Sequence, residues 1–284
     1  MKNTQRVAII TGGARGIGKA IAQKFIAEGI KVMICSRHAQ EVKQTLRDLN
    51  SKGKLCKGLV IDVSKEAECK KLIRMTLKTF GRIDILVNNA GIYGDIGFLE
   101  AGSSAEWEKA FLINVFGMMY CTKSVLPYMK KLGSGKIINL AGAGVGGKKP
   151  LPRFSSYYVS KAAVVAFTEV IAAEVAENNI QVNCVSPGAV NTFFTDYLLS
   201  QGEVKAGKEM YAQATKQKKS GGDSPTLTAD MAAFLASEES NHITGRMISA
   251  KWENKNSLLK LKPFSKSLYK LRRVDDFFFY EKKS

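Results

Sequence analysis

Histidine is scarce in this chain of 284 residues, where only His38 and His242 occur. Two histidines argue against a histidine-centred catalytic triad and against a metal site with several imidazole ligands. Any proton-transfer chemistry in this protein must therefore come from other side chains. The five cysteines are scattered and form no C-x-x-C pair, so neither a zinc site nor a disulfide framework is expected. Small buried thiols in a reducing compartment are the simpler interpretation.

Long apolar runs are also missing from the sequence. No run approaches the ~18 residues that a membrane-spanning helix needs. Apolar residues nevertheless make up 45% of the chain, enough to form a substantial core. The first residues lead at once into a short apolar run and then glycines, without the length or cleavage site of a signal peptide. We therefore expect a cytoplasmic protein with no membrane span.

Acidic residues are outnumbered, 25 against 43 Lys and Arg, which gives a net charge of +18. Such an excess can mark a nucleic-acid or membrane-surface partner. The densest basic segment is a tail at 251–284. Its basic side chains Lys260, Lys262, Lys266, Lys270, Arg272 and Arg273 are interleaved with Phe264 and Tyr269 and followed by Phe277–Tyr280. This chemistry suits single-strand binding, but equally a tail packed on a neighbouring subunit or on a membrane. No nucleic-acid-binding motif is present, so we expect no nucleic-acid partner.

Short apolar runs alternate with amphipathic segments along the first 250 residues. Strands are expected at 7–10, 31–35, 59–61, 83–87, 136–140 and 180–185, and helices at 16–28, 39–49, 64–80, 105–131, 155–177 and 228–237. This alternation predicts βαβ units. The fold class is therefore α/β, with a single Rossmann-type doubly wound parallel sheet in a three-layer αβα domain over 1–250 and a C-terminal extension over 251–284.

A glycine-rich turn, Thr11–Gly18, directly follows the first expected strand and opens the first helix. Glycine permits a tight turn and a close approach of the backbone to a pyrophosphate, while the helix N-terminus offers free N–H groups to the anion. This placement predicts a dinucleotide site. The residues of the turn expected to bind the cofactor are Gly12, Ala14, Arg15, Gly16, Ile17 and Gly18.

The end of the second expected strand indicates which dinucleotide binds. An acidic residue there favours a free ribose 2′-hydroxyl, but this chain has Ser36 and Arg37 and no carboxylate to repel a 2′-phosphate. Arg37 can pair with that phosphate, and Arg15 adds a second cation. We therefore expect NADP(H) rather than NAD(H). The alternative is that Arg37 is an ordinary solvated loop residue.

Together with motifs further along, these residues give the chain a resemblance to the short-chain dehydrogenase/reductase family, in a subgroup with an extended C-terminus. The motifs span about residues 5–248 and comprise Thr11–Gly18, Asp62-Val63, Asn88–Gly91, Asn114, Tyr157-x-x-x-Lys161 and Pro187-Gly188-x-Val190-x-Thr192. The resemblance implies that the adenine contacts Asp62 and Val63, that Asn89, Ala90 and Gly91 line the cofactor cleft, and that the nicotinamide carboxamide is held by Val190 and Thr192, next to Pro187 and Gly188. It also implies an oxidoreductase that interconverts a ketone and a secondary alcohol.

Tyr157 and Lys161 form a pair with its own physical logic. Four residues advance a helix by about 400°, so both side chains lie on one face, about 6 Å apart along the axis. A lysine ammonium favours the phenolate and lowers the tyrosine pKa from its usual value near 10. Tyr157 is then the proton donor or acceptor at a carbonyl oxygen as hydride is transferred, and Lys161 also binds the nicotinamide ribose. The resemblance adds Asn114 as the anchor of a water in the proton relay.

One side chain that the family leads us to expect is missing. The family places a serine just beyond the fifth strand, about 13 residues before the tyrosine, yet no Ser or Thr occurs from Leu140 to Phe154. Another donor, such as a glycine-loop N–H, a water or Ser155, could sustain catalysis at a cost of about 10²–10³ in rate. Alternatively, the glycines admit a bulkier substrate whose own hydroxyl replaces the serine. The third interpretation is an NADP-binding scaffold or regulator without redox activity.

The substrate segment is expected at 192–225 as a lysine-rich loop that closes over the substrate. Lys148, Lys149 and Arg153 precede Tyr157 and favour an anionic small-molecule substrate, although a solvated basic loop explains them equally well. The family's Asp-Gly-Gly ending near the last strand is also missing, which puts the usual tetramer in question. A homodimer or homotetramer remains the expectation.

Overall fold

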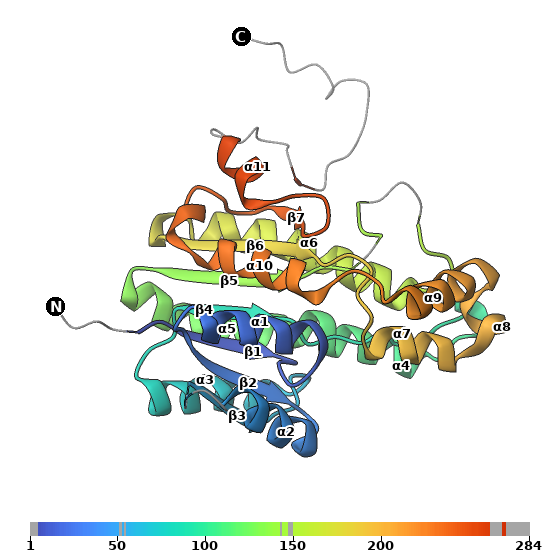
Figure 1. Ribbon diagram of the computed structural model, residues 1–284, viewed down its shortest axis with the longest axis horizontal. Coiled ribbons are helices and arrows are strands. Elements are labelled where there is room, and N and C mark those ends of the chain that lie inside the picture. Colours follow the sequence, from blue (N-terminus) through green and yellow to red (C-terminus); the bar gives the residue numbers. More distant parts are fainter. Residues whose placement is uncertain are drawn as a thin grey trace, which may run out of the picture.

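The computed structural model describes residues 5–50, 53, 55–142, 144–146, 150–261 and 269–270 of the chain. Within these residues seven parallel strands form one sheet, in the order β3-β2-β1-β4-β5-β6-β7 (Figure 1). The strands are β1 (Val7–Thr11), β2 (Lys31–Ser36), β3 (Cys56–Val60), β4 (Ile85–Asn88), β5 (Gly135–Leu140), β6 (Ile180–Ser186) and β7 (Met247–Ser249). The strand order reverses between β1 and β4, which confirms the expected doubly wound Rossmann-type sheet.

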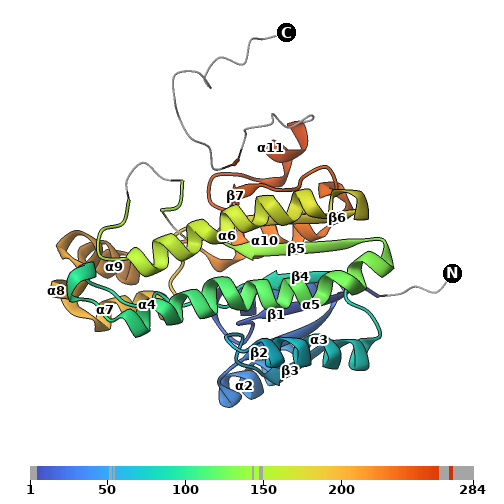
Figure 2. The same cartoon turned by 180° about the vertical axis from the view of Figure 1, so that it is seen from behind.

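Helices cover both faces of the sheet, one layer in front in Figure 1 and the other in front in Figure 2. The first layer holds α1 (Gly16–Ala27), α2 (Ala39–Leu49) and α10 (Pro225–Ala236), and the second holds α3 (Glu66–Phe80), α5 (Gly117–Leu132) and α6 (Ser155–Glu174). Side chains alternate along a strand, so Ile10 belongs to the core cluster of Phe25 in α1. Its neighbour Ile9 belongs to the cluster of Val125 in α5.

The remaining helices complete the described chain. They are η1 (Leu99–Ala101), α4 (Ser104–Phe111), the π-helical η2 (Leu112–Phe116), η3 (Ala176–Asn178), α7 (Phe193–Ser200), α8 (Gly202–Ala206), α9 (Lys208–Ser220), η4 (Glu238–Ser240) and α11 (Lys255–Lys260). The helices α7, α8 and α9 gather beyond the carboxyl ends of the strands, at the right of Figure 1. They replace the loop expected over 192–225. The lysine-rich composition hid the helical pattern of this segment. Only a few of its apolar side chains, such as Leu198 and Ala214, are buried, in a cluster that includes Phe154.

Several element boundaries also differ from the expectation. β3 begins at Cys56 rather than at residue 59. The sequence pattern missed its first residues because the strand is mostly only partly buried and shows no clear apolar alternation. The helix expected at 228–237 begins at Pro225 in the first turn, where the Ser224 side chain accepts a hydrogen bond from the N–H of Thr226. The short strand β7 was not among the expected strands.

The long helical stretch 104–132 resembles a membrane span by length and composition. It is the one such candidate among the described residues, and 44% of its most apolar window is buried inside the fold. It packs against α3 and β5 through buried residues including Cys121, Val125 and Met129. Burial of this kind is what a core helix in a layered domain requires.

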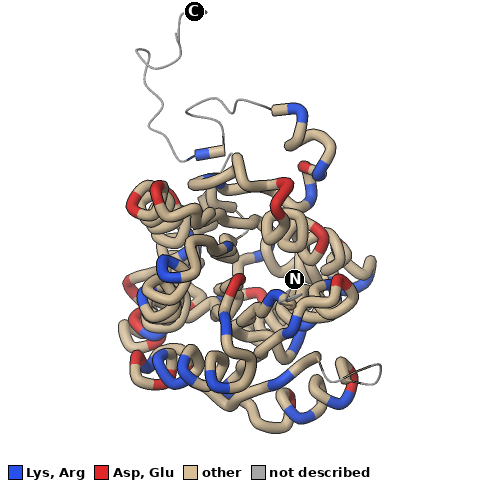
Figure 3. The backbone as a smooth tube through the Cα atoms, turned by 90° about the vertical axis from the view of Figure 1, so that its left-hand side faces the viewer, with Lys and Arg blue, Asp and Glu red and all other residues tan. Residues whose placement is uncertain are grey.

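Charges on the described surface are spread over many elements. Figure 3 shows Lys and Arg alternating with Asp and Glu along several helices. Some of them pair, as Lys24 does with Asp230 at 2.9 Å. The residues of the basic, aromatic tail that lie outside the described residues are Lys262, Phe264, Lys266, Arg272, Arg273 and Phe277–Tyr280. The role expected for the tail therefore stays a prediction. All five cysteines are buried, and none of them forms a disulfide. The cytoplasmic location stays a prediction.

Candidate active site

The glycine-rich turn packs closely against the carboxyl end of β4. Gly12 has a φ of +62°, and a Cβ there would lie 3.0 Å from both Ala90 Cα and Asn89 Nδ2. A Cβ on Gly18 would lie 2.4 Å from the Gly12 carbonyl oxygen. Only glycine fits at these two positions, because any larger residue would collide with backbone atoms.

Hydrogen bonds between β1 and β4 hold this turn in place. The Thr11 hydroxyl oxygen accepts the N–H groups of Asn89 at 3.0 Å and of Ala90 at 3.1 Å. In return, the Asn89 side-chain amide donates to the carbonyls of Thr11 at 3.0 Å and Gly12 at 3.1 Å. The two strands at the reversal of the sheet are thereby joined, and the N-terminus of α1 faces the space between them.

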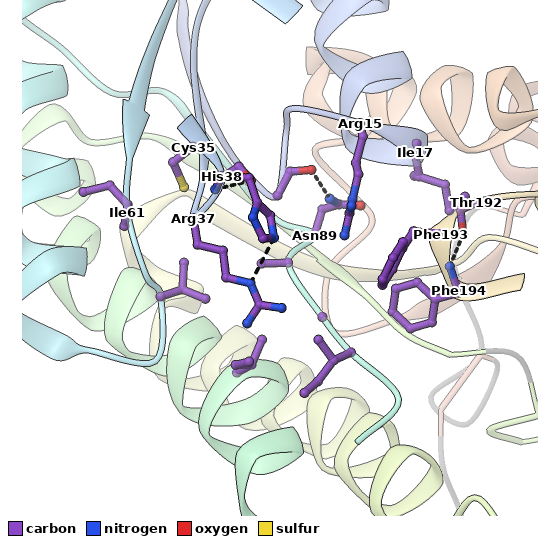
Figure 4. A pocket seen from close by; sticks show the side chains of 18 of the residues that line it. Arg15, Ile17, Cys35, Arg37, His38, Ile61, Asn89, Thr192, Phe193 and Phe194 are labelled. Carbon is purple, nitrogen blue, oxygen red and sulfur yellow. Dashed lines mark hydrogen bonds between the residues drawn. The ribbon is translucent and has the colours of Figure 1, made fainter. Parts of the chain in front are cut away.

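A cleft opens at this reversal, and we call it the central cleft (Figure 4). Twelve of the residues expected to bind the cofactor line it: Gly12, Arg15, Gly16, Ile17, Ser36, Arg37, Asp62, Val63, Asn89, Ala90, Gly91 and Thr192. The sequence reasoning did not assign the other lining residues to the cofactor site; they are Cys35, His38, Ile61, Ile92, Ile113, Phe193 and Phe194. The aromatic pair at 193–194 adjoins the motif ending at Thr192, so proximity to that motif was the available signal.

The remaining residues expected to contact the cofactor have structural partners instead. The Ala14 carbonyl accepts a hydrogen bond from Thr45 at 2.6 Å. Gly18 packs under the turn, and the Pro187 carbonyl accepts from Thr228 at 3.3 Å. A Cβ on Gly188 would lie 2.8 Å from an Asp223 carboxylate oxygen, and Val190 is buried and bridged to Gly222 and Asp223. Their contact with a cofactor stays a prediction.

No acidic residue stands at the end of β2 in the sequence, but the fold brings a carboxylate there from α2. Glu41, in the first turn of α2, lies beside Ser36 and Arg15. One carboxylate oxygen is 2.7 Å from an Arg15 guanidinium nitrogen and the other accepts from the Ser36 hydroxyl at 3.3 Å. The Arg15 guanidinium also lies 4.1 Å from the centre of the Phe193 ring, and Figure 4 shows the two side chains together. Arg37 projects separately beside His38, to which its Nε donates at 3.3 Å.

The buried helix α6 carries Tyr157 and Lys161, and a chain of buried polar side chains fixes that helix against the sheet. Asn139 of β5 accepts from the Asn88 amide and donates to Thr168 of α6, each at 2.9 Å. Lys161 is buried, and its ammonium donates to the Leu140 carbonyl at 2.8 Å. The structure therefore presents the lysine at the carboxyl end of β5.

Asn114 lies in the π-helical turn η2 and is also buried. Its side-chain oxygen accepts the Ile92 N–H, and its amide donates to the Ile92 carbonyl and to the Ser160 hydroxyl, each at 2.9 Å. A Cβ on Gly91 would lie 3.1 Å from this oxygen and 3.4 Å from the Lys161 ammonium nitrogen. Asn114 and Lys161 thus both lie beside Gly91, and the water that the resemblance places on Asn114 stays a prediction.

Burial changes the proton affinities of both residues of the pair. It raises the pKa of Tyr157 above its ordinary value, and the neighbouring Tyr93 hydroxyl adds to the increase. It lowers the pKa of Lys161 to about 8, because desolvation disfavours the ammonium. The expected lowering of the Tyr157 pKa by Lys161 is therefore wrong for this geometry, in which the loss of solvation raises that pKa.

The structure also identifies the glycine that stands nearest the tyrosine hydroxyl. A Cβ on Gly142 would lie 2.8 Å from the Tyr157 hydroxyl oxygen and 2.9 Å from Lys161 Cγ. A Cβ on Gly144 would instead meet Leu151 at 2.9 Å, and Gly144 has a φ of +98°. Gly142 is thus the position from which a serine would reach Tyr157.

The nearest hydroxyls on α6 do not replace that serine in this geometry. The Ser155 hydroxyl accepts from the Trp107 indole of α4 at 3.3 Å. The Ser156 hydroxyl donates to the Tyr93 carbonyl at 2.9 Å. Both side chains therefore serve the packing of α6 on its neighbours.

Aromatic rings surround Tyr157 on its other side. The Tyr93 ring lies with its centre 4.8 Å from the Tyr157 ring and 4.8 Å from the Phe194 ring, both edge to face. Phe154 and Tyr197 contact Tyr93 at 5.5 Å and 6.5 Å between centres. Burial raises the pKa of Tyr93 to about 12. The wall beside the proposed proton donor is therefore largely apolar.

The basic residues expected to attract an anionic substrate divide into two groups. Lys148 and Lys149 lie outside the described residues. Arg153 is engaged elsewhere, since its guanidinium donates to the Val204 carbonyl at 2.8 Å and lies 4.0 Å from the centre of the Phe98 ring. Arg153 thus connects the start of α6 to α8, and the anionic substrate stays a prediction.

A doubly wound parallel sheet with a glycine-lined cleft at its reversal defines a dinucleotide-binding protein of the Rossmann type. The family model of short chain dehydrogenases matches residues 6–202. Dehydrogenase/reductase SDR family member 4 of Caenorhabditis elegans is 37% identical over 246 residues, covering 86% of this chain and 92% of the relative. Its namesake from Sus scrofa is 33% identical over 243 residues, covering 86% and 85%. The chain belongs to the short chain dehydrogenase family.

Solved structures agree with this assignment. A variant of actinorhodin polyketide ketoreductase with NADPH superposes with a TM-score of 0.77 at 30% identity, covering 86% of this chain and 95% of that chain. NAD+-bound xylitol dehydrogenase gives a TM-score of 0.78 at 27% identity, covering 87% and 98%. The neighbours thus include complexes with both dinucleotides.

Proposed function

We propose that this chain is a nicotinamide-dependent oxidoreductase that interconverts a ketone and a secondary alcohol, with Tyr157 as the proton donor or acceptor. The observation that carries the proposal is the convergence of Tyr157, Lys161 and Gly142 at the carboxyl end of β5, beside the central cleft. A cofactor-binding scaffold without redox activity is the alternative. The reductase and dehydrogenase names of its relatives favour the enzyme.

The central cleft fits a dinucleotide on its own geometry. Gly12, Gly16 and Gly91 leave space that Cβ atoms would fill, and the N-terminus of α1 supplies N–H groups to a pyrophosphate. Arg15 and Arg37 favour a 2′-phosphate, so NADP(H) is our preferred cofactor. When bound, the nicotinamide supplies or takes up the hydride.

The protein's own part in the reaction is proton transfer. The raised pKa of Tyr157 keeps the phenol protonated at neutral pH, ready to donate to a carbonyl oxygen. The Lys161 side chain passes the same glycine as Tyr157 with its Cγ, and its ammonium, held on the Leu140 carbonyl, stabilises the phenolate that remains. The aromatic wall of Tyr93 and Phe194 favours an apolar group next to the reacting carbon.

A homodimer or homotetramer fits an apolar surface on the second helical layer. The exposed side chains of this surface are Leu112, Phe116, Tyr128, Leu132, Val159 and Val170, on η2, α5 and α6. Pairing of two copies through these helices would remove the side chains from water. Sedimentation velocity at micromolar concentration distinguishes this from a monomer.

The substitution Tyr157→Phe tests the proton donor, because it removes the hydroxyl and keeps the ring contacts with Tyr93 and Phe194. We expect turnover to fall by about 10²–10⁴ while dinucleotide binding changes little. The measurement is NADPH or NADH consumption over panels of ketones, oxo-acyl thioesters and keto-sugars. Tyr158→Phe is the control and should retain activity. Equal rates for wild type and Tyr157→Phe would refute the mechanism, and tight dinucleotide binding with no turnover in wild type would support the scaffold.

The pH dependence of ketone reduction tests Lys161. Its pKa of about 8 means that the ammonium is present below pH 8 and is lost above it. The value of kcat/KM should therefore be flat near neutrality and fall above about pH 8, approaching tenfold per pH unit. Burial also lowers the pKa of Lys136 to about 8, at the opposite end of β5, so Lys136→Met should keep the same profile. A profile that stays flat to pH 9.5, or one that shifts in Lys136→Met, contradicts the assignment.

The pair Gly142→Ala and Gly142→Ser tests the missing donor. Alanine adds a methyl group against Tyr157 and should lower turnover, whereas serine adds the same carbon together with a hydroxyl for the carbonyl oxygen. We expect the serine variant to exceed the alanine variant by about 10²-fold. Equal turnover in the two variants would show that a hydroxyl at this position gives the reaction nothing. Substrate consumption with saturating cofactor gives the comparison.

A further inference from the structure

Glu41 lies beside the part of the central cleft where an adenosine ribose is expected, in contact with the lining residues Arg15 and Ser36. It lies in the first turn of α2, five residues beyond the end of β2. Its carboxylate contacts Arg15, which the proposed function assigns to the 2′-phosphate, at 2.7 Å, and the neighbouring cleft residue Ser36 at 3.3 Å. Although no acidic residue stands at the end of β2, a carboxylate from α2 therefore reaches Arg15 and Ser36.

The contact is available to compete with a ligand. The Arg15 side chain is 43% exposed and that of Glu41 28%, so neither is locked in the core. Arg15 is shared between two partners on separate elements, because its guanidinium also stacks on Phe193 of α7. A dianionic 2′-phosphate would have to draw Arg15 away from Glu41, or accept the negative charge of Glu41 nearby. A free 2′-hydroxyl meets neither cost.

Arg37 does not share this arrangement. It takes part in none of the ion pairs formed among the described residues, and its Nε donates to the neighbouring His38 ring. It remains available to a phosphate whether or not Glu41 holds Arg15. Arg37 can therefore contribute to the proposed preference for NADP(H) directly, whereas Arg15 contributes only once it is released from Glu41.

We propose that Glu41 is a specificity-determining residue that limits the preference for a 2′-phosphate by holding Arg15 and Ser36 and by its own charge. This inference rests on the proposed function, since it concerns the same dinucleotide site. It follows that the chain keeps usable affinity for NAD(H), and that removing the charge at position 41 widens the preference for NADP(H). Glu41 acts on the ligand partly through Arg15 and partly by its own charge, and it is not a catalytic residue.

The test is the near-isosteric substitution Glu41→Gln. Dissociation constants are measured for NADP+ and NAD+, and for adenosine 2′,5′-bisphosphate against 5′-AMP as minimal probes of the 2′-phosphate. We expect about tenfold tighter binding of the two 2′-phosphorylated ligands, from the loss of one nearby negative charge, and a change of less than twofold for the other two. A general structural effect would move all four constants together.

The matched control is Asp48→Asn. Asp48 lies on the same helix and pairs with Lys19 of α1 at 2.6 Å, so the substitution removes the same charge from a similar interhelical ion pair two turns away. Its four dissociation constants should stay within twofold of wild type. In an Arg15→Gln background the gain from Glu41→Gln should shrink, because part of the effect passes through Arg15.

The outcomes separate the inference from the proposed function. An unchanged ratio of NADP+ to NAD+ affinity in Glu41→Gln overturns the role of Glu41 and leaves the dinucleotide site standing. An equal gain in Asp48→Asn overturns it as well, since the effect would then be one of general charge. Failure of wild type to bind any of the four ligands sinks both the site and the inference.

Discussion

The close approach of the glycine-rich turn to the end of β4 is the constraint on which the rest of the site depends. Thr11 and Asn89 exchange hydrogen bonds across the reversal of the sheet, and a Cβ on Gly12 would lie only 3.0 Å from Ala90 Cα. This contact fixes where the N-terminus of α1 points. It also places Gly12 and the segment Asn89–Gly91, which follow β1 and β4, side by side in the lining of the central cleft.

The catalytic side of the cleft depends on a second constraint, the buried attachment of α6 to β5. The Asn139 amide connects strand and helix, and Lys161 reaches the Leu140 carbonyl from the same helix. Burial holds the geometry but costs solvation, which moves the pKa values of Tyr157 up and Lys161 down. Precise placement and shifted proton affinity thus have one physical origin.

The glycine at position 142 links this geometry to the unusual sequence. Because no Cβ is present there, Tyr157 packs directly against the β5 loop, and its hydroxyl occupies space that a serine side chain would need. The opposite wall is aromatic. In the proposed function the site therefore relies on shape and on the tyrosine–lysine pair, with fewer polar contacts to a substrate carbonyl than a serine-bearing site would have.

The sequence by itself determined the fold class, the glycine-rich turn and the Tyr157–Lys161 pair, because helical and strand periodicity and fixed spacing along one element are local properties. It could not find Glu41 beside Arg15, the helices over 192–225 or the aromatic wall. These depend on side chains from separate elements meeting in space, which no local pattern encodes. The same holds for the pKa values, since only tertiary burial decides how much water a charged group loses.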